Sequence, residues 1–415
     1  MSYFRFLRDN RRWLAGGILL TTFSGFGQTF FIALSSGDLR AAFELSHGEF
    51  GLLYMLATLT SATLLPWVGK AVDIFPPHKV AAAVIVSLAA FCAAMASVIS
   101  VPMLFVTIVG LRLCGQGMMT HTSMTAMARW FSAQRGRAVS FAAMGFPVAE
   151  SLMPTAFVML SGLAGWRTGW AIGAGLLVFL ALPLIVFLFS RERQPGELDG
   201  KVRATSVRDW TRAEVLRDPV FWLASAGILA PPFINTAILF NQVYLVNLRG
   251  WTLEHFAGAF VVMAGFAVMS SLTLGSLIDR FSARALLPYA IVPLACACLV
   301  LAFVHTPWAP FVFMAMFGVG NGFTATLSGA LWPEIYGSRH IGAIRSVAFA
   351  MMVFASAAGP GTMGLLIDAD VPFDAQVIGM ALYCVAVTLI LMRVSGGIRK
   401  RNEAQVLQYG IEDAT

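Results

Sequence analysis

The stretch GSLIDRFSAR, Gly275–Arg284, ends a long apolar run with an acid and two bases, and the earlier stretch GKAVDIFPPHK, Gly69–Lys79, ends another run in nearly the same way. A glycine followed four residues later by an aspartate is common by chance. Further matches, however, keep the same spacing to within one residue: Gly136 with Gly342, Pro154 with Pro360, and Gly115-Gln116-Gly117 with Gly320-Asn321-Gly322. Matches that stay in register along the chain indicate two related halves.

The runs before these stretches are long and apolar enough to cross a membrane. Of the 415 residues, 58% are hydrophobic and 12% are charged, whereas soluble domains carry about 25% charged residues. Charge-free runs recur near the roughly 20 residues that span hydrocarbon as a helix. We predict an all-α membrane protein with twelve transmembrane helices, at residues 13–36, 50–69, 80–99, 102–128, 137–160, 168–190, 219–246, 255–277, 285–304, 307–331, 342–367 and 374–394.

A polar segment separates the sixth predicted helix from the seventh. It reads RERQPGELDGKVRATSVRDWTRAEVLRDP and carries seven basic residues but no apolar run. The segment divides the helices into two pseudo-symmetric sets of six. We predict four parts, which are an N-terminal bundle at 1–190, a cytosolic linker at 191–218, a C-terminal bundle at 219–395 and a cytosolic tail at 396–415.

The net charge of +7 is explained by the distribution of basic residues among the loops. If the N-terminus is cytosolic, all but four of the 28 Lys and Arg lie on the cytosolic side; Arg40, Arg167 and Arg249 lie outside, and Arg112 lies within a helix. Cytosolic loops of membrane proteins carry this excess of basic residues. We expect a monomer in the lipid bilayer of the plasma membrane, the bacterial inner membrane, with both termini cytosolic and no nucleic-acid partner.

Asp73 and Asp279 stand at the C-terminal ends of the second and eighth helices. An acid in that place is unfavourable against the helix dipole by ~0.3–1 kcal/mol, so each aspartate needs a partner elsewhere. For one such residue a solvated helix end would be the simpler interpretation. For the repeated pair we favour a lock, in which each acid contacts basic residues or a helix N-terminus on the cytosolic side and releases them when that side opens.

Amide side chains are concentrated in every third helix. Polar groups in lipid are costly and face the bundle interior or a water-filled cavity. A central cavity lined by the first, fourth, seventh and tenth helices would explain the pattern, although amides also join helices to one another. The predicted substrate-binding residues are therefore Gln28, Gln116, Asn235, Gln242 and Asn321, with Asn241 beside them on the seventh helix.

Two ionisable residues lie deep in predicted helices. Arg112 is in the fourth helix, where burial of its charge near the centre costs at least ~2.5–3.5 kcal/mol, and Glu150 is near the middle of the fifth. Buried ionisable groups in membranes are usually functional. We predict that Arg112 binds substrate and that Glu150 exchanges protons. The alternative is a mutual ion pair that only holds the two helices together.

The twelve helices, the stretches GKAVD and GSLIDR, and GLRLCGQG in the fourth helix resemble the major facilitator superfamily over nearly the whole chain. ARWFSAQRGRAVS, Ala128–Ser140, and GPGTMGLLID, Gly359–Asp368, are similar to the oxalate/formate antiporter and monocarboxylate porter group. The resemblance implies two six-helix bundles that rock about a central cavity. It also implies a gating role for Asp73, Asp279, Arg280 and Arg284, and identifies Arg112 as the arginine of the superfamily's second motif.

The chain departs from these patterns at several positions. No base follows Asp73, and Pro76-Pro77 stands where glycine and bases are usual, so the first lock would be weaker. The first helix, in FSGFGQ, lacks the acid of monocarboxylate porters. The eighth and eleventh helices lack the interior bases of oxalate antiporters, with Arg345 only at an entrance. One central cation therefore favours a monoanion or a largely neutral solute over a dianion.

Two functions remain open, and a third interpretation, a receptor-like or purely structural role, would leave the repeat and the polar pattern of the helices unexplained. The first is a secondary transporter of a small organic anion, monocarboxylate-like, that works by alternating access with protons as the coupling ion. The second is a proton-coupled exporter of amphipathic drugs or metabolites, although GFPVAESLMP lacks the Gly-x-x-x-Gly-Pro run usual in the fifth helix of such exporters. An enzyme or a nucleotide-driven pump is not expected, because Gly69-Lys70 is followed by Ala71 and no phosphate-binding loop is present. We expect no cofactor, no metal and no catalytic residues.

Overall fold

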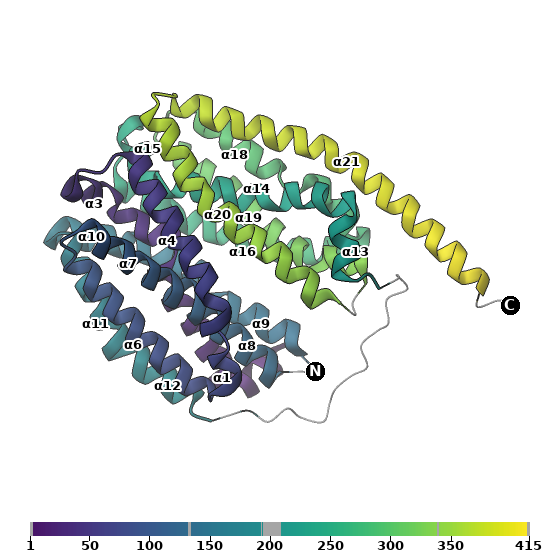
Figure 1. Ribbon diagram of the computed structural model, residues 1–415, viewed down its shortest axis with the longest axis horizontal. Coiled ribbons are helices and arrows are strands. Elements are labelled where there is room, and N and C mark those ends of the chain that lie inside the picture. Colours follow the sequence, from purple (N-terminus) through teal and green to yellow (C-terminus); the bar gives the residue numbers. More distant parts are fainter. Residues whose placement is uncertain (1–2, 132–133, 192, 194–208, 338–339, 413–415) are drawn as a thin grey trace. The chain divides into compact units, whose positions relative to one another are not determined.

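The structure is a computed structural model that describes residues 3–131, 134–191, 193, 209–337 and 340–412. Within these ranges the side chains of 3–5, 135, 279 and 399–412 are not described. The predicted linker therefore lies mostly outside the described residues. The two predicted bundles lie mostly inside them, and the described segments form helices joined by short connections (Figure 1).

The first half of the chain contains helices that agree with the predicted spans to within a few residues at most of their ends. They are α1 (Tyr3–Phe23), η1 (Ser24–Gly27), α2 (Thr29–Ile32), η2 (Ala33–Ser35), α3 (Ser36–Phe43), α4 (His47–Val68), α5 (Ala71–Ile74), α6 (Pro77–Ala96), α7 (Val101–Leu111), η3 (Arg112–Met119), α8 (Thr120–Trp130), α9 (Arg135–Ala143), α10 (Gly145–Ala164), α11 (Trp166–Leu176), η5 (Leu177–Ala181) and α12 (Leu182–Phe189).

The second half begins with a short helix in the predicted linker and ends with a helix that continues past the last predicted span. Its elements are α13 (Arg212–Arg217), α14 (Pro219–Phe240), α15 (Gln242–Arg249), α16 (Leu253–Phe281), α17 (Ala283–Leu286), η6 (Leu287–Tyr289), α18 (Val292–Phe303), α19 (Ala309–Tyr336), α20 (Ile341–Asp368) and α21 (Phe373–Glu412).

Local sequence signals set several of the helix starts. At α4 the Ser46 hydroxyl accepts from the Glu49 amide at 3.0 Å, and the Glu49 carboxylate accepts from the Ser46 amide at 2.8 Å. This reciprocal cap satisfies two amides that have no partner inside the helix. Thr211 and Glu214 form the same arrangement at α13. Between α10 and α11 the chain turns at Gly165, whose φ of 82° favours glycine.

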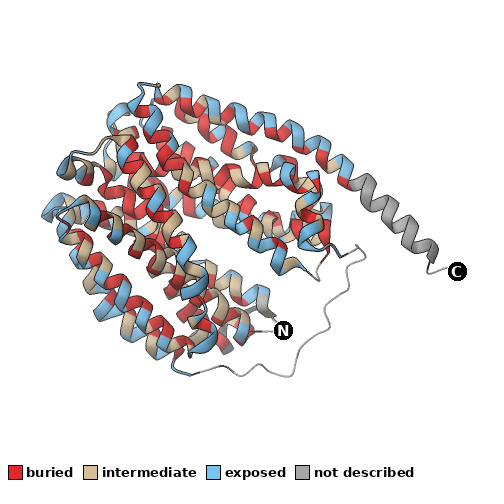
Figure 2. Ribbon diagram, in the orientation of Figure 1, coloured by how far each residue is buried: buried red, intermediate tan, exposed pale blue. Residues whose placement is uncertain are grey.

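Eleven of the described helices are long and apolar enough to span a membrane, and a bent pair brings the number to twelve. The bent pair is Phe6–Gly27 with Thr29–Phe43, and its two parts meet at 42°. Many large apolar residues on these helices are exposed, including Leu163 at 86% and Phe179 at 83%. Figure 2 colours exposed residues pale blue along the ribbon. Such exposure suits lipid contact and would be unusual over so much of a soluble protein.

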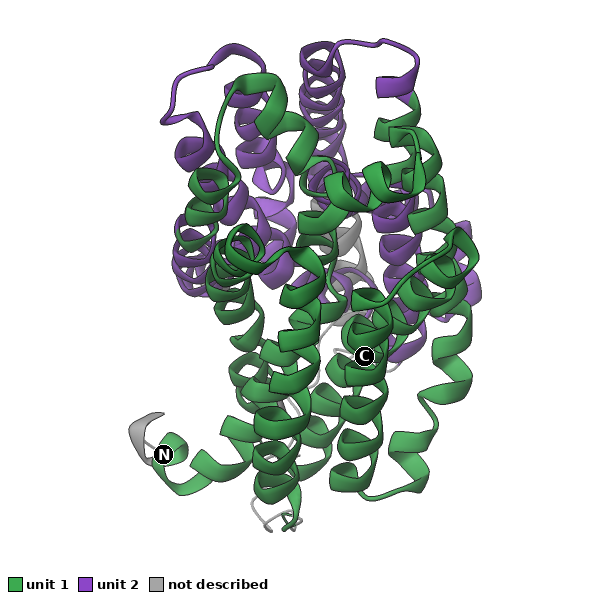
Figure 3. Cartoon of the chain, turned by 90° about the vertical axis from the view of Figure 1, so that its left-hand side faces the viewer, with its two compact units in different colours: residues 1–201, 239–261, 360–365 green, residues 202–238, 262–359, 366–415 purple. Residues whose placement is uncertain are grey.

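The chain folds into two compact units (Figure 3). Unit 1 comprises 1–201, 239–261 and 360–365, and unit 2 comprises 202–238, 262–359 and 366–415. In unit 1, α1 packs against α8, α9, α10 and α12, and α6 packs against α11 and α12. In unit 2, α18 packs against α19 and α21. The boundaries of the four predicted parts stay a prediction.

The first transmembrane helix is broken at Gln28, which the sequence pattern did not predict. The glycines in Ser24–Gly27 favour a break because glycine is a poor helix former, and this stretch winds as a 3₁₀ helix before Gln28 becomes extended, with φ −84° and ψ 153°. The seventh predicted helix is also interrupted, at Asn241 between α14 and α15. Each break leaves backbone groups and an amide side chain, that of Gln28 or Asn241, within a predicted transmembrane span.

Candidate transport site

The break in the first helix packs directly onto the fourth helix. A Cβ built on Gly27 would lie 2.1 Å from the carbonyl oxygen of Leu111 and 2.7 Å from the Cα of Gly115. Helix four is π-helical there, over Arg112–Met119, and π-turns in helices are frequent at functional sites. Only glycine allows backbones to approach this closely. The contact brings the Arg112 side chain to the carbonyl group of Gly27 at the break.

Arg112 is buried, with 1% of its surface exposed. Its Nη1 donates to the carbonyl oxygen of Gly27 at 3.1 Å and to the Thr29 hydroxyl at 3.3 Å. The guanidinium carbon lies 5.4 Å from the centre of the Tyr54 ring. Its Nε has no hydrogen-bond partner, and no carboxylate pairs with Arg112 among the described residues. The cation is therefore held by neutral groups, which leaves it able to attract an anion.

Glu150 lies on α10, which also packs against the break, at Gly25. A Cβ on Gly25 would meet the Cβ of Ala149 at 3.1 Å and would overlap the sulfur of Met153 at 2.4 Å. The Glu150 side chain is half-buried, and within the described part of the chain it forms neither an ion pair nor a hydrogen bond. The predicted alternative, a mutual Arg112–Glu150 pair, is not present in this structure.

Three predicted substrate-binding amides also belong to unit 1. Gln28 stands at the break and Gln116 in the π-helical stretch, and both side chains are half-buried. Gln242 is fully buried and donates from Nε2 to the carbonyl oxygen of Phe30 at 3.0 Å, while its Oε1 has no partner among the described atoms. Gln242 thus satisfies backbone next to the break.

The other two predicted amides, Asn235 on α14 and Asn321 on α19, belong to unit 2. Asn235 Nδ2 donates to Asn321 Oδ1, so the structure joins these two residues directly. The Oδ1 of Asn235 is buried and lacks a described partner. In the same unit, Gly318 and Gly322 let α19 approach α16, since a Cβ on either would lie 2.2 Å from a carbonyl oxygen of that helix.

The predicted gating residues lie at helix ends. Asp73, at the end of α5, is exposed and has no partner among the described side chains. The backbone of Asp279 belongs to α16, and its side chain lies outside the described part of the chain. Arg280 is exposed and covers the ring of Phe281 at 5.2 Å. Arg284, at the start of α17, is half-buried and has a defined partner.

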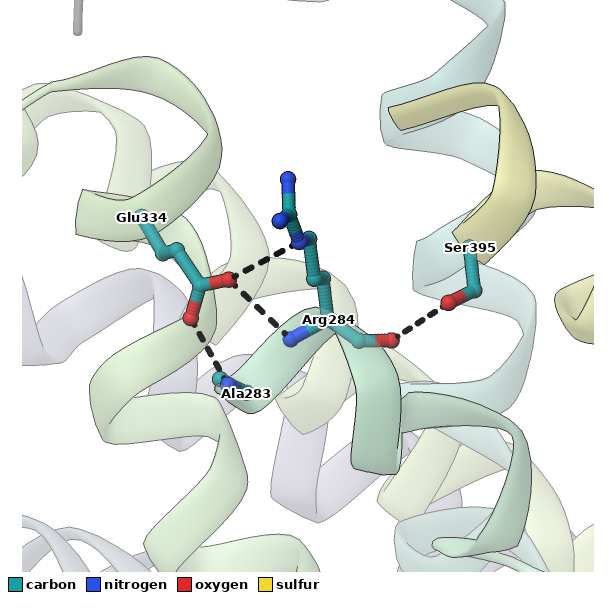
Figure 4. Close-up of polar contacts among 4 residues, drawn as sticks. All are labelled: Ala283, Arg284, Glu334 and Ser395. Atoms are coloured by element: carbon teal, nitrogen blue, oxygen red, sulfur yellow. Dashed lines mark hydrogen bonds and ion pairs between the residues drawn. The ribbon is translucent and has the colours of Figure 1, made fainter. Parts of the chain in front are cut away.

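That partner is Glu334 near the end of α19, which the sequence reasoning missed. As Figure 4 shows, the Glu334 carboxylate accepts from the amides of Ala283 at 2.7 Å and Arg284 at 3.4 Å, and its oxygen lies 3.8 Å from Arg284 Nε. The Ser395 hydroxyl on α21 donates to the Arg284 carbonyl oxygen at 2.8 Å. An acid in WPEIYG at the end of a long apolar run was the available signal. The cluster joins the start of α17, the last turn of α19 and the middle of α21.

Unit 1 also contains a set of close contacts that we call the outer seam. These contacts join the first two membrane helices to 239–261 and 360–365, at ends predicted to be non-cytosolic. A Cβ on Gly51 would lie 2.7 Å from the Pro360 carbonyl oxygen, and one on Gly364 would lie 2.4 Å from that of His47. Two aromatic contacts and one glycine contact complete the seam: Phe50 with Phe240 at 5.2 Å, Tyr54 with Phe240 at 4.5 Å, and Gly37 with Val243.

A small cavity of about 10 Å³ lies beside the outer seam, roughly the space that one water molecule needs. Its lining residues are Ser36, Arg40, His47, Phe50, Phe240, Asn241 and Tyr244. Pockets that enclose a small-molecule ligand usually measure about 300–1,000 Å³. This cavity is therefore too small to be the main substrate site, and Arg112 is not among its lining residues.

Comparisons with known proteins support the family and the fold. The profile of the Major Facilitator Superfamily matches residues 17–360, whereas no curated protein matches the sequence. A bacterial homologue of the human lysosomal transporter Spinster, inward-facing and unoccupied, is similar with a TM-score of 0.69 and 17% identity, over 94% of this chain and 96% of that one. A variant of the nucleoside transporter NupG is similar with a TM-score of 0.69 and 15% identity, over 92% and 99%. The predicted all-helical membrane fold is confirmed.

Proposed function

Because this chain belongs to the major facilitator superfamily, and is thus a multi-pass secondary transporter and not an enzyme, we propose that it carries a small organic monoanion of the monocarboxylate type. The observation that carries the proposal is the burial of Arg112 among neutral partners. The residue is 1% exposed, and among the described residues its guanidinium contacts only a carbonyl oxygen, a hydroxyl and an aromatic ring.

An anion would complete the environment of that cation. A buried charge is costly unless it is paired and hydrogen-bonded, and hydrogen bonds between guanidinium and carboxylate groups are about twice as strong as neutral ones. Arg112 Nε has no described partner that an anion would need to displace. A single cation balances a single negative charge, which favours a monoanion over a dianion.

Glu150 is the proposed proton carrier. It lies on α10 beside the break that Arg112 also contacts from η3, and within the described part of the chain it is not paired with Arg112. Because Glu150 and Arg112 are not paired in the described structure, a proton can bind to Glu150 in a step that is independent of substrate binding at Arg112. Gln28, Gln116 and Gln242, with Asn235 and Asn321 of unit 2, are proposed to hydrogen-bond the substrate.

The proposed gate on the cytosolic side consists of Asp73, Asp279, Arg280 and Arg284. Support comes from Arg284, which is held by Glu334 at a junction of three helices. Asp279→Asn should slow transport while the protein stays folded, because the change removes a state-dependent contact and not core packing. Normal transport, together with unchanged accessibility on that side, would mean that Asp279 is only a solvated helix end.

We further propose that the chain belongs near the oxalate/formate antiporter and monocarboxylate porter group and lies in the bacterial inner membrane as a monomer with both termini cytosolic. The motifs Ala128–Ser140 and Gly359–Asp368 support the grouping, and the loop charges support the orientation. The structural neighbours named above are not members of that group, so the grouping depends on the motifs alone.

The test combines a thermal-shift screen of purified protein against monocarboxylates, dicarboxylates and lipophilic cations with uptake into liposomes, with and without a proton gradient. Monocarboxylates should stabilise the parent protein and not Arg112→Gln. Arg167→Gln is the matched control, because Arg167 also donates to backbone carbonyls, those of Ala96 and Val98, but is exposed. Stabilisation by lipophilic cations alone would favour the exporter hypothesis.

A further inference from the structure

We propose that Tyr54 is a positioning residue that couples anion binding at Arg112 to the packing of Phe240 at the outer seam. Tyr54 lies on α4 and is fully buried. It touches both the Arg112 environment and the seam, and all of these residues belong to unit 1. The coupling rests on the proposed role of Arg112. The experiment below therefore tests the Tyr54 contacts separately from the proposed substrate class.

One hydroxyl joins Tyr54 to Arg112. The Tyr54 hydroxyl donates to Thr29 Oγ1 at 2.8 Å, and Arg112 Nη1 donates to the same oxygen at 3.3 Å. The Arg112 cation also lies over the Tyr54 ring at 5.4 Å. Thr29 is 8% exposed and follows the break at Gln28. A movement of the guanidinium would therefore change two of the contacts that hold the tyrosine.

The Tyr54 ring also contacts the aromatic residues of the seam. The ring lies 4.5 Å from that of Phe240, and Phe240 stacks on Phe50 at 5.2 Å. Phe50 and Tyr54 are four residues apart on α4 and so share one helix face. Both phenylalanines are buried, at 1% and 2% exposure. Packing this tight transmits a displacement of one ring to its neighbours, because interiors have few voids to absorb it.

An incoming carboxylate would compete with this arrangement. Charge-assisted bonds to a carboxylate are stronger than a bond to a hydroxyl, so the guanidinium would leave its long contact with Thr29 and weaken its contact with the ring. Tyr54 would then be held on one side only by its hydrogen bond to Thr29. The expected result is a looser Tyr54–Phe240 contact and a seam that opens more readily when anion is bound.

The experiment places a thiol reporter in the seam. Val243→Cys is made in a Cys296→Ser background, since Cys296 is exposed whereas the other four cysteines are buried. A Cβ built on Gly37 would lie 3.0 Å from Val243 Cγ1, and Val243 is half-buried, so a thiol there is partly shielded while the seam is closed. The measured quantity is the rate of labelling by a maleimide in purified protein, with and without benzoate or lactate.

Without ligand, Tyr54→Phe should label about two- to tenfold faster than the parent, the range that follows from losing one ordinary hydrogen bond. Thr29→Val should act in the same direction, and Thr29→Ser, which keeps the hydroxyl, should label at the parental rate. Tyr383→Phe is the control, because it removes a tyrosine hydroxyl that donates to Ala226 in unit 2. With benzoate or lactate, the parent should label faster, and Tyr54→Phe should still bind without a further change in rate.

Parental labelling rates in both Tyr54→Phe and Thr29→Val would overturn the coupling, as would an equal increase in Tyr383→Phe. A ligand response that persists unchanged in Tyr54→Phe would overturn it as well. If instead no carboxylate stabilises the parent protein, the proposed substrate class is wrong, and the ligand-free rates still decide whether Tyr54 holds the seam.

Discussion

Gly27 and Gly115 hold the first and fourth membrane helices together with no side chain between them, since a Cβ on Gly115 would lie 2.6 Å from the Cα of Gly27. This contact is what allows Arg112 to donate to the Gly27 carbonyl at 3.1 Å. The position of the buried cation therefore depends on backbone approach as much as on its own hydrogen bonds.

Gly27→Ala should destabilise the protein by about 1–3 kcal/mol or more, the usual cost of an extra carbon in a packed interior. The added carbon would overlap the Leu111 carbonyl, which is backbone and cannot rotate away. Gly162→Ala is the control, because no atom lies within 4 Å of its Cβ and it is also helical. Thermal unfolding in detergent measures both. Equal melting temperatures for the two variants would contradict the close contact.

Arg112→Gln and Glu150→Gln should act independently. Because no ion pair joins the two residues in the described structure, their coupling free energy should stay within about 0.5 kcal/mol, the limit for non-interacting sites. Arg112→Gln should abolish carboxylate binding, whereas Glu150→Gln should keep binding and exchange but lose proton-driven accumulation. A double-mutant cycle in stability and liposome uptake is the measurement. Transport restored in the double variant would mean that Arg112 does not recognise substrate.

Glu334→Ala should cost more stability than Arg284→Gln. The Glu334 carboxylate accepts two backbone hydrogen bonds at α17, and loss of a helix cap costs about 0.5–2 kcal/mol. The ion pair is about a quarter exposed on each side, so its own contribution should be at most about 1 kcal/mol after solvent screening. The melting temperatures of the two variants show which change costs more stability. A larger loss in Arg284→Gln would mean that the ion pair contributes more than the two backbone hydrogen bonds of Glu334.

The predicted orientation is testable with two single cysteines on described, exposed positions. Ala213→Cys lies on α13, in the predicted cytosolic linker, and Ala42→Cys lies on α3, in a predicted outer loop. In a background with Cys296→Ser, a membrane-impermeant maleimide added to intact cells should label Ala42→Cys and leave Ala213→Cys unlabelled until the cells are opened. The reverse pattern would overturn the orientation drawn from the loop charges.

The membrane fold and several candidate residues could be predicted from the sequence because their signals are local. Hydropathy and length identify the spans, and a lone arginine such as Arg112 within one of them stands out. The direct Asn235–Asn321 hydrogen bond agrees with the prediction that helices seven and ten turn amides to a protein interior, although it leaves their substrate role a prediction.

Other features depend on contacts between distant parts of the chain. In the sequence, Tyr54 is one of many aromatic residues on apolar helices. Its contacts with Thr29 and Phe240 exist only in the folded protein. In the sequence, Glu334 resembles a solvated acid at a helix end. Only the fold places the start of α17 beside it. Around the break at Gln28, side chains from distant parts of the chain satisfy backbone carbonyls, since Arg112 donates to Gly27 and Gln242 donates to Phe30.

The π-helical stretch Arg112–Met119 also has a consequence for how the two halves of the chain are aligned. A π-turn accommodates one residue more than the α-helix around it, whereas the corresponding α19 is uninterrupted. An additional residue before Gly115 matches the one-residue shift of the Gly-Gln-Gly and Gly-Asn-Gly triplets against the other repeated pairs. A related sequence that lacks one residue in this stretch should have a continuous α-helix as its fourth helix. Its arginine would then be rotated by about 100° about the helix axis, away from the Gly27 carbonyl.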